Sequence, residues 1–178
     1  RQWQRAGRLR TLAMTDPLTG TASRLAIEKI LDAALADAHR HARPLSLLLL
    51  DLDHFKEIND GYGHAAGDTV LRLVTQAWQA QLRDDDRLGR LGGEEFAVVC
   101  PGATEAQAEV IANRLLDATR RLDLSAIDPG LRVTTSIGVS QAQHDDSRER
   151  LLRRADVALY QAKQDGRDRS VRASAPAP

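Results

Sequence analysis

The chain has 178 residues, of which 42% are hydrophobic and 28% charged, proportions that are ordinary for a soluble globular protein with one sizeable core. Lys plus Arg and Asp plus Glu both number 25, so no overall field draws the chain to nucleic acid or to a membrane. The single cysteine, Cys100, excludes an intrachain disulfide and a zinc cluster, and its apolar neighbours indicate a core thiol.

No stretch is long and apolar enough to span a bilayer, and no secretory signal is visible. We therefore expect a cytoplasmic domain. Because the chain opens on Arg1 and not on Met, we also expect a longer protein, with an upstream sensor domain or a membrane anchor.

Residues 1–15 carry apolar side chains at roughly helical spacing among arginines. The segment is too short to be a stable helix alone in water. Two interpretations stay open: the end of a signalling helix that pairs with its copy in a dimer, or a terminal helix packed on its own domain. The turn residues 16–20 then break the pattern.

An amphipathic helix is predicted from residue 22 to about 43, with Ser23 as a competent N-cap and Pro44 as its stop. Residues 45–50 are a nearly unbroken apolar run, typical of a strand covered on both faces. The run ends in Asp51-Leu52-Asp53, where strand alternation would place the two carboxylates on one face.

A helical turn over residues 54–60 leads to a glycine-containing loop over residues 61–67. This loop has neither the Walker A pattern nor the dinucleotide fingerprint, so it is a weak phosphate signal. Asp68 opens the next predicted helix, where an N-cap is the default role of an aspartate. The alternative is that its carboxylate accepts hydrogen bonds from the N1–H and N2–H₂ edge of a guanine.

Gly92-Gly93 separates two short runs and predicts a hairpin turn, followed by Glu94, Glu95 and a buried strand to Cys100. A helix starting near Thr104, a β-branched strand over 131–139, a helix over 148–164 and an edge strand over 168–171 complete the pattern. We expect an α+β fold, a mixed sheet covered by helices, as the catalytic domain over residues 16–171, and a disordered tail over 172–178.

Asp51 at one strand end and Glu94 at the hairpin would converge as ligands of a divalent cation if their strands are neighbours. Glu95 follows directly and would diverge in regular strand geometry, so it is a candidate for the reacting hydroxyl or a second ion. Arg83-x-x-Asp86 has two interpretations: a second guanine site, or a local salt bridge at the base of the hairpin.

Several separated motifs together resemble the GGDEF family of diguanylate cyclases, in the GGEEF variant, from Asp16 to about Arg169. In chain order they are Asp16-Pro17-Leu18-Thr19-Gly20, Asp51-Leu52-Asp53-His54-Phe55-Lys56, Asn59-Asp60, Gly63-His64, Gly67-Asp68, Gly92 to Phe96, Ser136-Ile137-Gly138-Val139, and Ala155-Asp156 through Tyr160, Lys163, Gly166 and Arg167. The chain departs from the family at Thr21, Ser23 and Leu91, changes that we expect to be tolerated.

The resemblance implies a ferredoxin-like palm fold, mostly antiparallel and related to adenylyl cyclase domains, and condensation of two GTP into cyclic di-3′,5′-GMP across a homodimer. It implies Mg²⁺ or Mn²⁺ as the cofactor. The residues it designates fall into three groups. Metal binding and catalysis fall to Asp51, the Leu52 carbonyl, Glu94, Glu95 and Lys56; substrate contacts to Asn59, Asp68, His64, Lys163 and Arg167; an inhibitory product site to Arg83, Asp86 and Arg114.

At i, i+4, Lys163 and Arg167 would share a helix face and hold a triphosphate between them, or else only offset the helix dipole. Two other functions remain as alternatives. One is a catalytically silent module that binds GTP or cyclic di-GMP and signals through a partner. The other is a cyclase that uses ATP, which the pair of Asn59 and Asp68 disfavours.

Overall fold

The apolar run that follows Pro44 forms the central strand of the fold, β1 (Leu45–Leu52), and all of its residues are buried. The computed structural model describes residues 13–174. Strand β1 pairs antiparallel with β3 (Glu95–Pro101) on one side and with β4 (Thr135–Gln141) on the other. A strand with neighbours on both sides and helices on both faces favours apolar side chains along most of its length, which explains its leucines.

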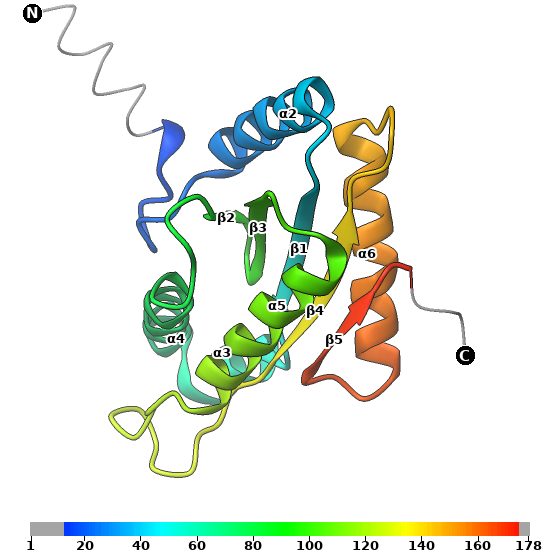
Figure 1. Ribbon diagram of the computed structural model, residues 1–178. Helices are drawn as coiled ribbons and strands as arrows, with labels where there is room; N and C mark the ends of the chain where they lie inside the picture. The colour runs from blue at the N-terminus through cyan, green and yellow to red at the C-terminus, as the bar shows by residue number, and fades with distance from the viewer. Residues whose placement is uncertain (1–12, 175–178) are drawn as a thin grey trace, which may run out of the picture.

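Two further strands complete a five-stranded sheet of order β2-β3-β1-β4-β5 (Figure 1). Strand β2 (Arg87–Gly92) pairs antiparallel with β3, whereas β5 (Arg169–Arg172) runs parallel to β4 at the opposite edge. The first four strands and their connecting helices follow the βαββαβ order of ferredoxin-like folds. The expected α+β class, with a mixed and mostly antiparallel sheet, is confirmed.

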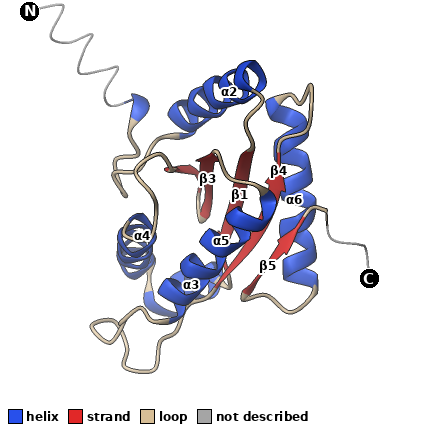
Figure 2. Ribbon diagram, viewed as in Figure 1, coloured by secondary structure: helices blue, strands red, loops and turns tan. Residues whose placement is uncertain are grey.

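Helices cover both faces of the sheet (Figure 2). α2 (Arg24–His41) and α6 (Arg148–Gln164) pack on one face, while α3 (Phe55–Tyr62), α4 (His64–Gln79) and α5 (Glu105–Arg120) lie on the other. Alternate residues of β1 divide between the two layers: Leu48 and Leu50 belong to the core under α3–α5, and Leu47 and Leu49 to the core under α2 and α6.

The helix starts follow from their capping residues. The Ser23 side chain accepts a hydrogen bond from the Ala26 N–H, as predicted. Thr104 and Gln107 form a reciprocal capping box at the start of α5.

Cys100 is buried in the core, and burial raises the pKa of its thiol.

The strand predicted over residues 131–139 is displaced: β4 begins at Thr135 and ends at Gln141. The neighbouring strand accounts for the difference. Thr135 pairs with Leu52, the last residue of β1, so residues 131–134 have no strand to continue along. Leu131 and Val133 are nevertheless buried, which gave the segment its strand-like pattern.

A close approach between β4 and α6 fixes the position of the last helix. A Cβ atom on Gly138 would lie 2.1 Å from the Ala155 carbonyl oxygen and 2.5 Å from the Leu159 nitrogen, so only glycine permits this packing. The contact positions α6 so that Lys163, near its C-terminal end, reaches the end of β1.

The predicted helix over residues 1–15 lies largely outside the described part of the chain. At the other end, the Ala173 N–H donates to the Val139 carbonyl just beyond β5, and the predicted tail is outside the description from residue 175. Within residues 13–174, none of the helices combines the length and apolar character that a membrane crossing requires.

Candidate active site

The Gly-Gly turn forms the predicted hairpin between β2 and β3. Gly92 and Gly93 have φ angles of 154° and 52°, a region of backbone space that favours glycine. Arg90 steadies the turn: its Nε–H donates to the Gly93 carbonyl at 2.9 Å, and its Nη1 lies 3.4 Å from the Asp16 carboxylate. This contact ties the hairpin to the turn that precedes α2.

The two acidic segments lie side by side at one end of β1. The Leu52 N–H donates to the Glu94 carbonyl at 3.3 Å, and Asp51 is the cross-strand partner of Glu95. Convergence of Asp51 and Glu94 was expected only if their strands are neighbours. The structure meets this condition, because β1 pairs with β3.

Asp51 is buried, with 6% of its surface exposed, and is more buried than Glu94 or Glu95. Its Oδ2 lies 2.5 Å from Lys163 Nζ, which α6 carries to the site. Burial raises the pKa of Asp51 above its ordinary value; Lys163 opposes that rise, and the charges of Glu94 and Glu95 add to it. The negative charges of the three carboxylates thus act on one another, an arrangement that a cation would relieve.

The donor set fits Mg²⁺ or Mn²⁺. Carboxylate oxygens from Asp51 and Glu94, with a backbone carbonyl such as that of Leu52, are the hard ligands these ions prefer. The Lys163 ammonium is a positive charge already seated on Asp51, which marks the position as one that favours a cation.

Asp53 has a different role from Asp51. Its carboxylate accepts hydrogen bonds from the hydroxyls of Thr134 and Ser136, both at 2.7 Å, and from the Asp168 N–H at 3.1 Å. Because β1 ends at Leu52, strand alternation no longer governs Asp53. It fastens the loop before β4 and the turn after α6.

A cleft of about 350 Å³ opens beside the hairpin. It gathers five of the residues that the resemblance designated, from three separate parts of the chain. These are Lys56, Asn59, His64, Asp68 and Glu94, and the cleft is completed by Phe55, Leu71, Arg90 and Gly93.

The N-cap role considered for Asp68 is wrong. α4 begins at His64 with Gly63 as its N-cap, so Asp68 lies inside the helix. Gly63 has a φ of 88°, and that left-handed conformation lets the chain turn from α3 straight into α4. The predicted glycine loop is therefore mostly helical, and the Asp68 carboxylate is available to the cleft.

Gly67 makes room for the Asn59 amide. A Cβ atom at Gly67 would lie 1.9 Å from Asn59 Oδ1 and 3.2 Å from the Phe55 ring. Asn59 and Asp68 are both half-buried, and none of the side-chain hydrogen bonds among residues 13–174 engages either of them. Two groups that hydrogen-bond well are thus presented to the cleft without a protein partner in this part of the chain.

The predicted shared helix face of Lys163 and Arg167 is also wrong. α6 ends at Gln164, and Gly166 and Arg167 have φ angles of 119° and 66°. The helix therefore stops before Arg167, which sits on the following turn. Lys163 is directed at Asp51.

Arg83 and Asp86 are paired with each other. Arg83 Nη2 lies 2.7 Å from Asp86 Oδ1, the Arg83 backbone N–H donates to Oδ2 at 2.9 Å, and the Asp86 side chain is fully buried. This is the local salt bridge that was one of the two interpretations. Arg114, exposed on α5, makes no hydrogen bond or ion pair to Arg83 or Asp86 within the described residues.

Sequence reasoning missed Arg90 as a residue of the cleft. Its position two residues before the Gly-Gly turn was visible in the motif, but its partner, Asp16, is distant in sequence. Phe55 belongs to one of the sequence motifs, and the structure adds that both Phe55 and Leu71 line the cleft.

Comparison with known proteins agrees with this geometry. The family described as "Diguanylate cyclase, GGDEF domain" matches residues 13–169. The diguanylate cyclase DgcP of Pseudomonas aeruginosa is 39% identical over 160 residues, which is 90% of this chain and 24% of that protein. The diguanylate cyclase TpbB of the same species is 42% identical over 156 residues, covering 85% of this chain and 35% of TpbB. The chain thus spans only a quarter to a third of these relatives.

A solved structure, the GGDEF domain of DgcB from Caulobacter crescentus in complex with c-di-GMP, superposes with a TM-score of 0.87 at 32% identity. The superposition includes 92% of this chain and 97% of the DgcB chain. The palm-type fold implied by the resemblance is therefore the fold of this chain, which belongs to the family of GGDEF diguanylate cyclase domains.

Proposed function

We propose that this domain condenses two molecules of GTP into cyclic di-3′,5′-GMP, with a divalent cation held by Asp51 and Glu94. The observation that carries the proposal is the juxtaposition of a carboxylate cluster with a cleft whose polar side chains fit guanine. This is the activity that the relatives DgcP and TpbB are named for.

Guanine recognition is assigned to Asn59 and Asp68. An ionised carboxylate accepts two hydrogen bonds side by side, and the guanine N1–H and N2–H₂ groups supply two donors in that arrangement. Adenine has no such pair of donors on that edge, so Asp68 discriminates against ATP. His64 and Lys56 border the same cleft and contact the sugar and the phosphates.

The cation would be held by Asp51, Glu94 and the Leu52 carbonyl. When bound, it neutralises phosphate charge and makes the attacking hydroxyl more acidic. Lys163 serves the same end from the protein side: it holds positive charge on Asp51 while the cleft is empty and transfers it to the triphosphate when substrate enters. Arg167, on the adjoining turn, is a second phosphate contact, and Glu95 lies next to the reacting hydroxyl.

Each of the two phosphoryl-transfer steps forms one P–O bond and breaks one. The 3′-oxygen of one GTP attacks the α-phosphorus of the other, the bond from the α-phosphorus to the bridging oxygen breaks, and pyrophosphate leaves; the second ring bond forms in the same way. Because one cleft holds one nucleotide, two copies of the domain must face each other. We propose that the segment of residues 1–15, most of which lies outside the described residues, contributes to this pairing.

Product inhibition is assigned to the Arg83 and Asp86 pair, with Arg114 as an added contact. Arg can pair bidentately with guanine O6 and N7, and Asp can accept from N1 and N2. Cyclic di-GMP binding there requires the existing salt bridge to open or to be bound as a unit.

The experiment is to incubate the chain with GTP or ATP and Mg²⁺ or Mn²⁺, and to separate the nucleotide products by chromatography. We expect cyclic di-GMP and pyrophosphate from GTP and no cyclic dinucleotide from ATP. Glu94→Gln should abolish product formation while circular dichroism remains unchanged. Glu149→Gln, an exposed acid at the start of α6, is the matched control and should retain activity.

A module that binds nucleotide without turnover is a second candidate. The observation that favours it is the Lys163–Asp51 contact, because the Lys163 ammonium engages a carboxylate oxygen that the catalytic cation would need. The same assay separates the two functions. Saturable binding of GTP with no cyclic di-GMP, in a sample shown to be dimeric, would establish the silent module and overturn the enzyme.

A further inference from the structure

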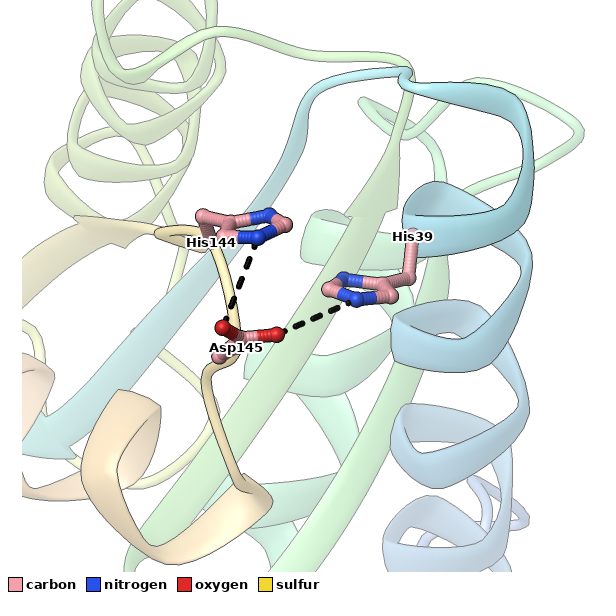
Figure 3. A group of neighbouring side chains, drawn as sticks. All are labelled: His39, His144 and Asp145. Atoms are coloured by element: carbon pink, nitrogen blue, oxygen red, sulfur yellow. Dashed lines mark ion pairs between the residues drawn. The ribbon is translucent and has the colours of Figure 1, made fainter.

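A second group of metal-ligating side chains lies at the opposite end of the sheet. Among residues 13–174, the group of three or more His, Cys, Asp or Glu residues whose ligand atoms all lie within 4.8 Å of one another is His39, His144 and Asp145. His39 is in the last turn of α2, and the other two belong to the loop between β4 and α6. Figure 3 shows the three side chains directed toward one another.

The distances fit a coordination polyhedron better than direct hydrogen bonds. His39 Nε2 lies 3.3 Å from Asp145 Oδ1, and His144 Nε2 lies 3.4 Å from Oδ2. An N–H···O bond is usually about 2.7–3.2 Å long. Ligands about 2.1 Å from a tetrahedral ion are separated by about 3.4 Å, which is close to the distance of each histidine nitrogen from its Asp145 oxygen.

The two imidazoles stack on each other, with centroids 5.0 Å apart and planes 15° apart. Each Nε2 faces one oxygen of the Asp145 carboxylate, and one ring must turn before both nitrogens can bind the same ion. The side chains of His39 and His144 are 51% and 86% exposed. Rotation of these exposed rings can bring the two nitrogens to the spacing of a bound ion without disturbing the core.

The loop that carries His144 and Asp145 is held in place by charge. Asp146 accepts two hydrogen bonds from Arg154, at 2.9 and 2.5 Å, and one from the Gln143 N–H at 2.7 Å. The Arg150 guanidinium donates to the Asp145 carbonyl. The backbone is therefore fixed on both sides of the ligands, which lowers the entropy that binding would cost.

We propose that His39, His144 and Asp145 form a binding site for a divalent transition-metal ion of the Zn²⁺ class, with water completing the coordination. Imidazole nitrogen suits Zn²⁺, Ni²⁺ and Cu²⁺, whereas Mg²⁺ prefers oxygen ligands. A hollow of about 750 Å³ lined by the same residues, together with Arg40 and Arg43, gives solvent access to the site.

The site is separate from the proposed catalytic cation. The Ala142 N–H donates to the Leu45 carbonyl at the beginning of β1, and Asp51 lies near the strand's other end. Six residues of strand span about 20 Å. An ion here would instead connect the C-terminal end of α2 to the loop that leads into α6, two segments from opposite halves of the chain.

The test uses the whole chain without a polyhistidine tag, stripped with a chelator, dialysed, and titrated with Zn²⁺ by calorimetry in excess Mg²⁺. We expect one Zn²⁺ per chain and, at a hundredfold excess over the dissociation constant, a rise in the thermal midpoint of about 8 °C. His39→Ala, His144→Ala and Asp145→Ala should each weaken binding at least tenfold. Co²⁺ should give the visible absorption of a low-coordinate ion, lost in the same variants.

His41→Ala is the matched control, because His41 is an exposed histidine in the same helical turn, paired with Asp37 at 3.2 Å. It should bind Zn²⁺ as the unaltered chain does. Absence of saturable Zn²⁺ binding overturns the proposal, as does binding that survives His39→Ala and His144→Ala. Neither result depends on cyclase activity, so failure here leaves the proposed function intact.

Discussion

Two pairs of residues, each suited to guanine on chemical grounds, stand in opposite states in this molecule. Asn59 and Asp68 face the cleft with no protein partner among residues 13–174, whereas Arg83 and Asp86 hold each other through a buried salt bridge. A guanine that reaches the first pair displaces no side-chain partner of that pair among the described residues. A ligand at the second pair must compete with a charge-assisted contact already made.

The difference teaches how to weigh a recognition motif. Free polar groups held in place by their surroundings indicate a site prepared for its ligand, and Gly67 and the hairpin provide that support for the cleft. A satisfied pair stabilises the fold whether or not it also binds. Substitutions in the first pair should therefore lower activity with little effect on stability, and substitutions in the second pair should affect both.

The largest expected effect comes from Asp68→Ala, which removes an acceptor of two hydrogen bonds from guanine. Each hydrogen bond to a charged group contributes about 1.5–3 kcal/mol, so kcat/KM for GTP should fall at least about 100-fold. Steady-state kinetics would measure it. Asp60→Ala, an exposed acid on α3, changes the charge equally and should leave kcat/KM nearly unaltered; equal losses in both variants would contradict guanine recognition by Asp68.

Gly67→Ala should break the cleft without removing any of its polar groups. The added Cβ would meet Asn59 Oδ1 at 1.9 Å, so the amide must swing away, and kcat/KM for GTP should fall about tenfold. Gly61→Ala is the control, because a Cβ there has nothing within 4 Å. Both variants should unfold within a few degrees of the original chain; unchanged kinetics in Gly67→Ala would mean that the Asn59 position does not matter.

Arg83→Ala should affect the second pair on two counts. It removes the guanidinium from the fully buried Asp86 carboxylate, so that residue 83 donates to Asp86 only through its backbone N–H. The loss should lower the free energy of unfolding by about 1–3 kcal/mol. For a chain of this size that corresponds to a fall of about 3–9 °C in the thermal midpoint, measurable by calorimetry.

The same variant should also relieve inhibition by added cyclic di-GMP. Arg87→Ala removes an exposed arginine nearby and should do neither. If product inhibition is the same with and without Arg83, the pair has only a structural role.

The smallest expected effect concerns Asp16, which supports the hairpin from a distance. Burial opposes its ionisation, but hydrogen bonds from Thr19 and the charge of Arg90 outweigh burial, so the pKa of Asp16 lies below 3.8. A lowered pKa stabilises the folded state above pH 3.8, and this contribution disappears as pH falls through the folded value. Asp16→Asn should cost about 1 kcal/mol at pH 7 and progressively less at lower pH. A cost that stays constant down to pH 2 in chemical denaturation would contradict the ionic role of Asp16.

The elements were largely predictable because their signals are local. The Ser23 and Thr104 caps, the leucine run of β1 and the Gly-Gly turn each encode an element within a few residues. The start of β4 was not, because Leu131 and Val133 are buried without pairing in the sheet. Where a strand begins depends on its neighbour.

The candidate site was predictable as a set of residues but not as a set of contacts. The salt bridges Lys163–Asp51 and Arg90–Asp16 have no local sequence pattern, because each joins residues that are far apart in the sequence. The N-cap alternative for Asp68 failed because Gly63 lets α4 begin four residues earlier, at His64. Lys163 and Arg167 do not share a helix face because α6 ends at Gln164.

The most direct test of the central claim is anomalous diffraction from crystals of the chain grown with Mn²⁺ and a non-hydrolysable GTP analogue. We predict a manganese peak in contact with the carboxylates of Asp51 and Glu94, with Lys163 moved from Asp51 to the phosphates. A nucleotide bound in the cleft while Lys163 stays on Asp51 and manganese lies elsewhere would contradict the account.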